Sequence, residues 1–211
     1  MKKDDGSISM NVVRRLPKYH RFLRELKVSS VVKISSKELS EITGFTASQI
    51  RQDLNTFGGF GKQGYGYDVN KLYKQISKIL GLNVRHKSII VGAGHLGQAI
   101  ANYSGFREYF LDMKGIFDID HDVIGRKVND MTVMDENYIK AFIEENSITV
   151  AIICTPRSVA ADLAEKLIDY GIKGIWNFAP VNLEERDGVS IENVSLAESL
   201  YVLSFLMNKN E

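Results

Sequence analysis

The chain has 211 residues, of which 44% are hydrophobic and 25% charged, with one cysteine and a formal net charge of +1. This length suits one large domain or two modest ones with packed cores, and the composition argues against a disordered protein. The sequence contains no apolar run long enough to span a bilayer and no signal peptide pattern at its start, which predicts a cytoplasmic protein without membrane contact.

Charge is divided unevenly along the chain. Residues 1–85 contain 16 Lys and Arg against 7 Asp and Glu, whereas the remainder contains 11 against 19. Two domains with different partners explain this division better than one, and the basic part is a candidate for contact with phosphate backbones. A basic face that is merely solvated would give the same counts. The single cysteine, Cys154, lies in an apolar run and has no CxxC partner, which predicts a buried thiol and no metal site.

The first predicted helix lies in residues 16–27, LPKYHRFLRELK. Pro17 suits the first turn of a helix, and apolar residues recur after it at spacings of three and four. The opposite face is basic and includes Lys18 and Arg21, which we predict to contact DNA.

Two further helices are predicted in close succession. Ser35 and Glu38 have the spacing of a capping box, and Gly44 suits the left-handed position after a helix end. Another cap at Thr46, with Gln49 three residues later, starts the next helix almost at once. Helices joined by so short a turn form a helix-turn-helix.

The second helix of this pair has two distinct faces. Ile50, Leu54 and Phe57 recur at helical spacing and are expected to face the core. The opposite face carries polar side chains that suit base edges and phosphates. These predicted DNA contacts are Ser48, Arg51, Gln52 and Asn55. An ordinary solvated helix face is the alternative, because helix-turn-helix spacing also arises by chance.

Residues 57–67 read FGGFGKQGYGY and precede a fourth predicted helix. Phe60, Tyr65 and Tyr67 suit strands, and the glycines around Lys62 suit a tight turn, so the segment predicts the hairpin of a winged helix. A thin basic tip fits a minor groove about 6 Å wide, which makes Lys62 the predicted wing contact. A flexible linker and a phosphate-binding loop are the alternatives, but linkers are rarely aromatic and no strand precedes the segment.

Residues 87–103, KSIIVGAGHLGQAIANY, place an apolar strand before a GxGxxG motif and an amphipathic helix, which is the context that a dinucleotide-binding loop requires. The predicted loop contacts are Gly92, Ala93, Gly94, His95, Leu96 and Gly97. Asp118 ends the next strand, 26 residues after Gly92, where a carboxylate accepts the ribose hydroxyls and repels a 2′-phosphate. The motif therefore favours NAD(H) over NADP(H), with an unused glycine loop as the alternative.

The alternation of strand and helix continues from MTVM to KGIWNFAP and predicts a parallel sheet with helices on both faces. Ligands collect at the strand ends of such sheets, which adds further predicted cofactor contacts. These are Thr155, Pro156, Asn177 and Phe178. The last segment, SLAESLYVLSFLMN, is apolar on more than one face, which predicts a subunit interface in a homodimer, with packing on its own sheet as the alternative.

With LPKYHRFLREL, IRQDL, FGGFGKQGYGY, VGAGHLGQAIANYSGF, FDID and GIKGIWNFAP in this order, the sequence resembles the Rex family over nearly its entire length. The resemblance implies a bacterial redox-sensing repressor that binds double-stranded operator DNA as a homodimer and leaves it when NADH binds, with NAD+ competing less effectively. It implies a winged helix-turn-helix DNA-binding domain in residues 1–84, a Rossmann-like NAD(H)-binding domain in residues 85–193 and a swapped dimerisation helix in residues 194–211.

The resemblance also implies individual roles. Arg51 and Gln52 become the base-reading pair and Lys62 the wing contact, while Tyr103 and Phe106 match an aromatic patch near the nicotinamide. The chain departs from the family pattern at three positions. These are Gln52, usually lysine; Thr56, commonly tyrosine or histidine; and Ser195, usually an aspartate in an ionic contact linked to the redox switch.

Two classes of function compete at this point. A redox-responsive repressor needs two states that bind the ligand unequally, and reduced nicotinamide is easier to bury than the charged ring of NAD+. Closure of the dimer around NADH would change the spacing of its two recognition helices. The alternative is an NAD-dependent oxidoreductase with a basic accessory domain, but no histidine is placed as an evident catalytic base and no second catalytic domain follows. The sequence therefore predicts a protein that is not an enzyme.

Overall fold

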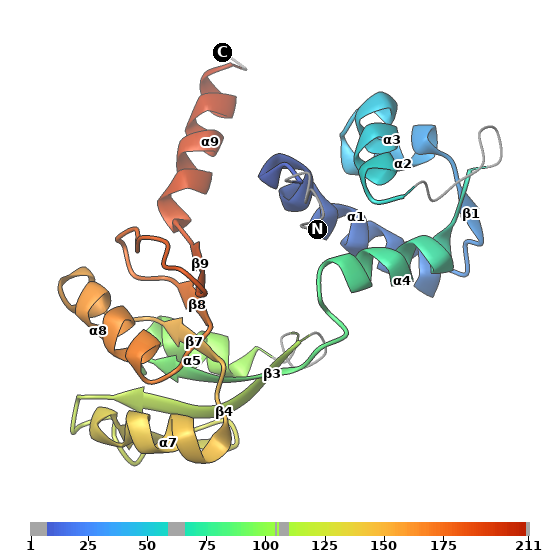
Figure 1. Ribbon diagram of the computed structural model, residues 1–211. Helices are drawn as coiled ribbons and strands as arrows, with labels where there is room; N and C mark the ends of the chain where they lie inside the picture. Colours follow the sequence, from blue (N-terminus) through green and yellow to red (C-terminus); the bar gives the residue numbers. More distant parts are fainter. Residues whose placement is uncertain (1–7, 59–65, 104, 106–109, 210–211) are drawn as a thin grey trace. The chain divides into compact units, whose positions relative to one another are not determined.

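The computed structural model describes residues 8–58, 66–103, 105 and 110–209, and the chain divides into two compact units, Met1–Val84 and Arg85–Glu211. The first unit is mainly helical and contains a two-stranded sheet (Figure 1). Its elements are α1 (Met10–Val28), β1 (Lys33–Ile34), α2 (Ser36–Thr43), α3 (Ala47–Thr56), β2 (Tyr67–Asp68) and α4 (Val69–Ile79).

Helix α1 begins at Met10 and carries Pro17 in its interior, so the prediction that Pro17 occupies the first turn is wrong. An interior proline removes one backbone hydrogen bond and crowds the preceding turn. The helix continues through it because Leu16, Tyr19 and Leu23 are fully buried in the core of this unit and hold both halves in place. Tertiary packing outweighs the local cost of the interior proline. A sequence pattern does not reveal such packing.

The predicted helix-turn-helix is confirmed by its caps. The backbone N–H of Ser35 donates to Glu38 Oε2 at 2.7 Å, and the N–H of Glu38 donates to Ser35 Oγ at 3.1 Å. Gly44 follows α2 in the left-handed region at φ 74°. The N–H of Gln49 then donates to Thr46 Oγ1 at 3.2 Å, which starts α3.

The predicted wing hairpin lies mostly outside the described residues, and its last residue, Tyr67, belongs to a small sheet. Tyr67 in β2 pairs antiparallel with Ile34 in β1, a strand that precedes α2 and that the sequence pattern did not single out. The backbone of Gly66 passes close to that of Ile34, so that a methyl group on Gly66 would lie 2.8 Å from the carbonyl oxygen of Ile34. Phe60, Lys62 and Tyr65 lie outside the described residues.

A buried histidine links α1 to α4. His20 is 6% exposed, and its ring stacks on Tyr73 with centroids 4.6 Å apart. Its Nε2 lies 3.0 Å from Ser77 Oγ, which itself donates to the carbonyl oxygen of Tyr73. Burial, with a smaller contribution from Arg24, lowers the pKa of His20. The folded unit therefore holds this ring neutral at pH values where an exposed histidine takes up a proton.

The expected result is a loss of stability on acidification. In the unfolded chain His20 takes up a proton near pH 6.5, whereas in the folded chain it does so only at lower pH. The free energy of unfolding is therefore highest above about pH 6.5 and decreases below it. Each unit of pKa difference corresponds to about 1.4 kcal/mol of unfolding free energy. Urea unfolding at pH 7.5 and pH 5.0 measures the loss, and His20→Gln is expected to show less of it. An equal loss in the variant would contradict the assignment.

The second unit is built on a seven-stranded sheet in the order β5-β6-β4-β3-β7-β8-β9. All neighbouring strands are parallel except β5 and β6. Its elements are β3 (His86–Val91), α5 (His95–Asn102), β4 (Leu111–Asp118), β5 (Lys127–Val128), β6 (Met131–Asp135), η1 (Glu136–Tyr138), α7 (Ile139–Asn146), β7 (Val150–Ile153), α8 (Arg157–Asp169), β8 (Gly174–Asn177), β9 (Ser190–Asn193) and α9 (Leu196–Asn208). The two edge strands β5 and β9 are additions to the predicted sheet.

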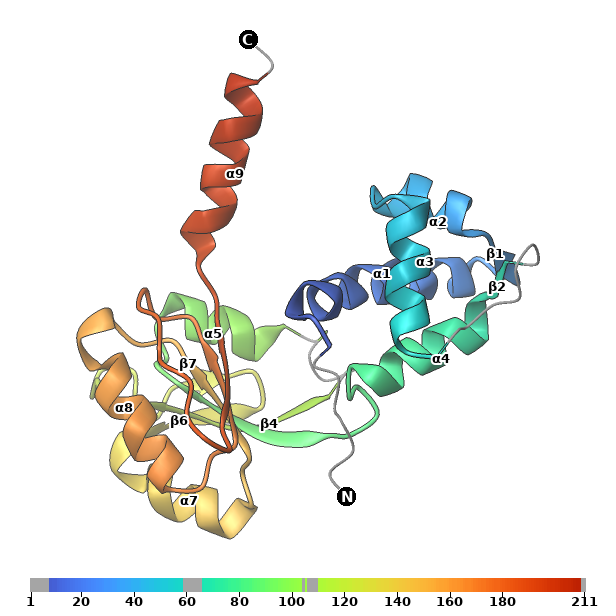
Figure 2. The ribbon, with the colours of Figure 1, turned by 45° about the horizontal axis from the view of Figure 1, so that its top comes forward.

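Helices cover both faces of this sheet, as predicted (Figure 2). Along β3, Ile89 and Val91 join the core under α7 and α8, whereas Ile90 joins the core under α5. This alternation is expected because successive side chains of a strand point to opposite faces. The carboxyl ends of the parallel strands consequently lie along one edge, where the loops that follow β3, β4, β7 and β8 meet.

Helix α9 follows β9 and buries none of its side chains within the described chain. Its apolar residues are exposed on several sides, with Leu200 at 62%, Tyr201 at 71% and Phe205 at 67%. In both views α9 has no helix or strand of its own unit beside it (Figures 1 and 2). None of the described helices, α9 included, is both long and apolar enough to cross a bilayer.

Candidate functional site

The outer face of α3 is polar and exposed. Ile50 and Leu54 are buried and Phe57 packs against the same core, so the helix presents its opposite side to solvent, as the sequence predicts. The exposed set is Ser48, Arg51, Gln52 and Asn55. Arg51 is also tied to the preceding helix, because its guanidinium donates to Ser36 Oγ at 3.2 Å. The predicted exposed polar face of α3 is therefore present, and its contact with DNA stays a prediction.

Two basic side chains of α1 lie on aromatic rings at the surface. Lys18 Nζ is 4.9 Å from the ring centre of Phe45, which belongs to the turn between α2 and α3. The Arg21 guanidinium is 4.8 Å from the ring centre of Phe22. Such contacts hold a cation in place while leaving it available to phosphate. The predicted role of Lys18 and Arg21 in DNA binding remains a prediction.

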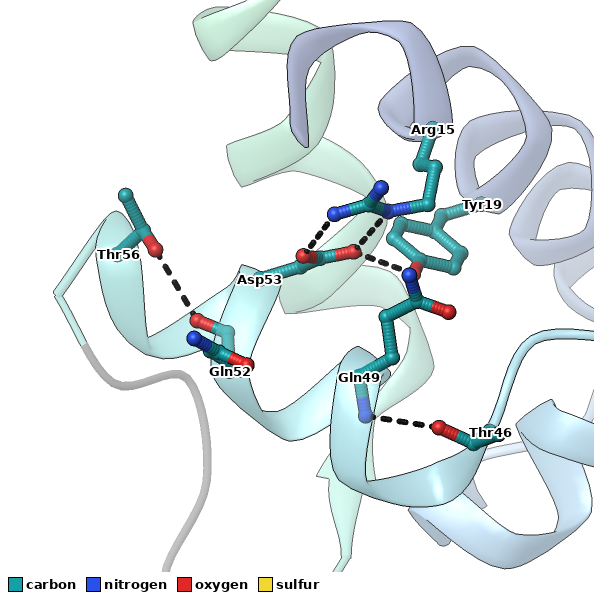
Figure 3. A network of polar contacts seen from close by, with 7 residues as sticks. All are labelled: Arg15, Tyr19, Thr46, Gln49, Gln52, Asp53 and Thr56. Atoms are coloured by element: carbon teal, nitrogen blue, oxygen red, sulfur yellow. Dashed lines mark hydrogen bonds and ion pairs between the residues drawn. The ribbon is translucent and has the colours of Figure 1, made fainter. Parts of the chain in front are cut away.

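The inner face of α3 holds a charged residue that the sequence reasoning missed. Asp53 is 1% exposed and accepts two hydrogen bonds from Arg15, from Nε to Oδ2 and from a terminal nitrogen to Oδ1, each 2.7 Å long. The hydroxyl of Tyr19 donates to Asp53 Oδ2 at 2.7 Å (Figure 3). The available signal was the position of Asp53 on the apolar side of α3, together with Arg15 and Tyr19 one helical turn apart in α1.

A cavity of about 690 Å³ lies at the carboxyl ends of the parallel strands in the second unit. Seven of the predicted cofactor contacts line it, and they lie at the end of β4, in the loops after β3, β7 and β8, and in the first turn of α5. They are Gly92, Gly94, Leu96, Asp118, Thr155, Pro156 and Phe178. Phe178 packs edge-on against Trp176 with ring centres 4.6 Å apart, which fixes this wall of the cavity.

The three glycines of the GxGxxG motif differ in what an added methyl group would contact. Gly92 has φ 101°, and a methyl group there would lie 2.6 Å from the carbonyl oxygen of Cys154. A methyl group on Gly97 would lie 1.9 Å from the carbonyl oxygen of Gly92. On Gly94 it would meet no heavy atom of the described residues within 4 Å, and it would project into open space. Gly92 and Gly97 therefore serve the fold, whereas Gly94 keeps the cavity open for close approach to the backbone.

Asp118 fixes the glycine loop from the neighbouring strand. Its Oδ2 accepts the N–H of Ala93 at 2.6 Å, and its Oδ1 accepts those of Ile119 and Asp120 at 2.7 and 2.9 Å. The carbonyl oxygen of Ala93 accepts from Gln98 Nε2 at 2.7 Å. A carboxylate has about four acceptor positions, so Asp118 retains capacity for a ligand hydroxyl.

Two further observations fit a phosphorylated ligand. Helices α5 and α8 both begin at the cavity, and neither has a side-chain hydrogen bond at its N-cap among the described residues. Helix starts of this kind favour phosphate. The buried hydroxyl of Thr155 has no hydrogen-bond partner within the described chain. A buried polar group without a partner is costly, and a ligand hydroxyl or phosphate in the cavity would supply one.

The remaining predicted cofactor contacts lie elsewhere. Ala93 is buried in the loop and Gly97 in the first turn of α5, whereas His95 is exposed at the start of α5 and Tyr103 is 58% exposed at its end. Asn177 is fully buried, and its amide donates to the carbonyl oxygen of Val181 and to Asn193 Oδ1 while accepting from the N–H of Ala179. The structure thus gives Asn177 a supporting role beneath the loop that carries Phe178. Phe106 lies outside the described residues.

Several lining residues were missed by the sequence reasoning. They are Val91, Ile119, Glu136, Cys154, Val159, Asp162, Leu163, Lys166 and Pro180. Four of them recur at spacings of three and four on α8, so that one face of this helix forms a wall of the cavity. That periodicity was visible in the sequence, but it is equally typical of a helix face packed on a sheet.

Cys154 lines the cavity and is only partly buried, so it is less enclosed than predicted. Burial raises the pKa of its thiol to about 12. Only the thiolate reacts with alkylating reagents, so at pH 8 we expect iodoacetamide to modify Cys154 on the order of a thousandfold more slowly than an exposed cysteine. Mass spectrometry over time measures the rate, with the guanidinium-unfolded chain as the fast control. Equal rates in the folded and unfolded chains would show that the thiol is not protected.

No group of three or more His, Cys, Asp or Glu side chains within the described residues is placed to hold a metal ion.

Family profiles match both units. A profile described as "Putative DNA-binding protein N-terminus" matches residues 7–55, and one described as "CoA binding domain" matches residues 83–181. The second description names a class of nucleotide-binding domain, and its range covers the glycine loop and the carboxyl ends of the strands.

Curated relatives match along the whole chain. A protein named redox-sensing transcriptional repressor Rex from Clostridioides difficile strain 630 is 52% identical over 205 residues, which cover 97% of this chain and 98% of the relative. A protein with the same name from Clostridium perfringens strain 13 is 52% identical over 211 residues, which cover 100% and 99%.

Solved structures of similar sequence share the fold. A repressor named RSP, crystallised with β-NAD+ and operator DNA, has a TM-score of 0.90 and 52% identity, covering 96% of this chain and 94% of its own. The same repressor with β-NADH has a TM-score of 0.89 and 49% identity, covering 97% and 96%.

Proposed function

Because the chain belongs to the Rex family of redox-sensing transcriptional repressors, we propose that it binds operator DNA through its N-terminal unit and leaves the DNA when NADH binds its second unit. The observation that carries this proposal is the presence, in one chain, of a helix-turn-helix with an exposed polar face and a Rossmann-like cavity. Family members are repressors, so neither site is assigned a catalytic step, and an oxidoreductase is not favoured. A repressor acts on DNA, and we place this one in the cytoplasm.

The DNA-binding unit is expected to use α3 as its recognition helix. Arg51 can bind guanine O6 and N7, and Gln52 and Asn55 can pair with the N6 and N7 atoms of adenine. Lys18 and Arg21 on α1 and Ser48 at the start of α3 are proposed to contact phosphates, which fix the register without reading sequence. Lys62 is proposed to reach the minor groove from the wing.

The cavity of the second unit is proposed to bind NAD(H). Gly94 would admit the pyrophosphate to the start of α5, and Asp118 would accept the ribose hydroxyls. Thr155, Pro156 and Phe178 would line the nicotinamide side. When bound, NADH presents an uncharged nicotinamide ring, which is easier to bury than the positive ring of NAD+. Among the described residues, three carboxylates line the cavity, Asp118, Glu136 and Asp162, against one amine, that of Lys166. This balance disfavours the extra phosphate of NADP(H).

The protein is proposed to act as a homodimer joined through α9. The exposed apolar side chains of this helix need a partner, and a second copy supplies one. A two-fold symmetric dimer would place two recognition helices on half-sites one turn of DNA apart, about 34 Å. Tyr103 and Phe106 are proposed to lie near the nicotinamide, where a partner's α9 would complete the enclosure.

Fluorescence anisotropy tests the proposal directly. The labelled operator duplex that RSP binds is titrated with the protein at several fixed concentrations of NADH and of NAD+. We expect NADH to weaken binding and NAD+ to counteract it. Arg51→Ala is expected to weaken operator binding by about 1 to 3 kcal/mol, and Lys62→Ala is expected to weaken it by less. If NADH leaves operator affinity unchanged, the proposed regulation is wrong, and normal binding by both variants would reject the proposed contacts.

A further inference from the structure

The inner face of the recognition helix carries a buried carboxylate. Asp53 is 1% exposed and lies on the same side of α3 as Ile50 and Leu54, which are 0% and 1% exposed. An apolar side chain would fill such a position at lower cost, because burying a carboxylate is unfavourable unless it is paired and hydrogen-bonded. Gln52, the neighbouring residue, projects on the opposite side of α3 (Figure 3).

Asp53 is fully paired by α1. Arg15 grips both carboxylate oxygens at 2.7 Å, and the Tyr19 hydroxyl adds a third hydrogen bond of 2.7 Å. The hydrogen bond to Asp53 raises the pKa of the Arg15 guanidinium, and burial followed by the bond to Asp53 raises that of Tyr19. The Arg15 guanidinium is therefore charged and the Tyr19 hydroxyl is protonated throughout the physiological pH range.

This contact is directional where apolar packing is not. The main helix contacts of the unit pair α1 with α4 and α2 with α3, and the Arg15–Asp53 pair joins one helix of each. A bidentate arginine–carboxylate contact fixes distance and angle, whereas hydrophobic burial depends mainly on area. A rotation of α3 by about 20° would move atoms at its outer radius of about 5 to 6 Å by about 2 Å. That displacement exceeds what a bidentate hydrogen bond to a base tolerates.

We propose that Asp53, held by Arg15 and Tyr19, is a positioning residue that fixes the rotation of α3 and so directs its outer face at the bases. This inference rests on the proposed function, because it assigns Asp53 to sequence reading by the same helix. Phosphate contacts tolerate small shifts, since attraction to the DNA backbone depends on charge more than on exact geometry. Loss of the contact should therefore reduce sequence discrimination and leave non-specific DNA affinity intact.

The decisive variant replaces the pair with apolar residues, Arg15→Met/Asp53→Leu. Removing one positive and one negative charge keeps the net charge of the chain, so the electrostatic part of DNA binding is preserved. Exchanging a buried ion pair for apolar residues of similar volume is often neutral or stabilising for the fold. Anisotropy titrations with the operator duplex that RSP binds and with a scrambled duplex of equal length give the specificity ratio.

We expect the ratio to fall at least about tenfold, which corresponds to losing part of one bidentate base contact. Scrambled-duplex affinity, its dependence on salt and NADH binding should stay near their native values. The thermal midpoint should fall only slightly, because the buried Tyr19 hydroxyl loses its acceptor. A native ratio in the double variant would overturn the proposal. A parallel fall in both affinities together with a lowered thermal midpoint would overturn it as well, because the contact would then serve stability only.

Tyr19→Phe decides the question if the double variant does not fold. It removes one hydrogen bond from Asp53 and retains the ring, and we expect a specificity ratio about threefold below the native one. Tyr73→Phe is its matched control, because it removes a hydroxyl from the same unit without touching Asp53 and should leave the ratio unchanged. An unchanged ratio in Tyr19→Phe would overturn the proposal. Failure of the native chain to prefer the operator would instead reject the proposed function.

Discussion

Gly94→Ala is expected to shift NADH-driven release to higher NADH concentrations while leaving the protein folded and bound to operator DNA. The native φ of Gly94 is −69°, which alanine adopts without strain. A methyl group there meets no heavy atom of the described residues within 4 Å, so the fold has room for it. The same methyl group occupies the space through which a ligand approaches the start of α5, and overpacking at that point should cost roughly 1 to 3 kcal/mol of binding, or about 5- to 150-fold.

The measurement is a titration of NADH by fluorescence, followed by operator release at each NADH concentration. Gly92→Ala is the matched comparison, because its methyl group would lie 2.6 Å from a backbone carbonyl at a positive φ and should lower the thermal midpoint of the second unit. Gly94→Ala should melt at the native temperature or slightly above it. Native NADH affinity in Gly94→Ala would mean that the ligand does not approach the backbone at this glycine.

Leu200→Glu/Phe205→Glu is expected to convert the proposed dimer into monomers and to remove most operator binding. Both side chains are largely exposed in the single chain, at 62% and 67%, so a monomer would lose almost nothing by the change. In a dimer joined through α9, each buried apolar side chain contributes about 1.5 to 3 kcal/mol, and each buried glutamate adds a further cost. Because each subunit carries both substitutions, four apolar side chains are lost from the interface. The dimer dissociation constant should therefore rise by at least about a thousandfold.

Sedimentation equilibrium measures the dissociation constant, and anisotropy measures the accompanying loss of operator affinity, which is expected because half of a two-fold site binds weakly. Asn208→Glu, at the exposed end of the same helix, is the control for added charge and should remain dimeric. A native chain that is monomeric at micromolar concentration, or a dimeric double variant, would show that α9 does not hold the subunits together.

The parts of this fold that depend on neighbours in sequence were predictable. The capping box of Ser35 and Glu38, the left-handed Gly44 and the strand that ends at Asp118 all follow from spacing. They could be predicted because the atoms involved lie within one turn or one strand–helix unit of each other. The same reasoning separated the exposed polar face of α3 from its buried face.

The parts that depend on distant segments were not predictable. Pro17 is tolerated in α1 only because buried residues on both sides hold the helix, and Tyr67 pairs with Ile34 across the whole of α2 and α3. Asp53 needs Arg15, which is 38 residues away, to be stable inside. Periodicity reports which face is buried, but not which polar residue on that face has found a partner.

The three backbone hydrogen bonds accepted by Asp118 have a consequence for the speed of sensing. These bonds hold the loop in one conformation, and a loop that is already ordered does not pay an ordering cost each time a ligand arrives. Occupancy of the cavity should then follow the ratio of reduced to oxidised nucleotide as fast as the ligands meet and leave it. Transcription would lag behind metabolism by the exchange time of a small molecule, rather than by the time that a disordered segment needs to fold.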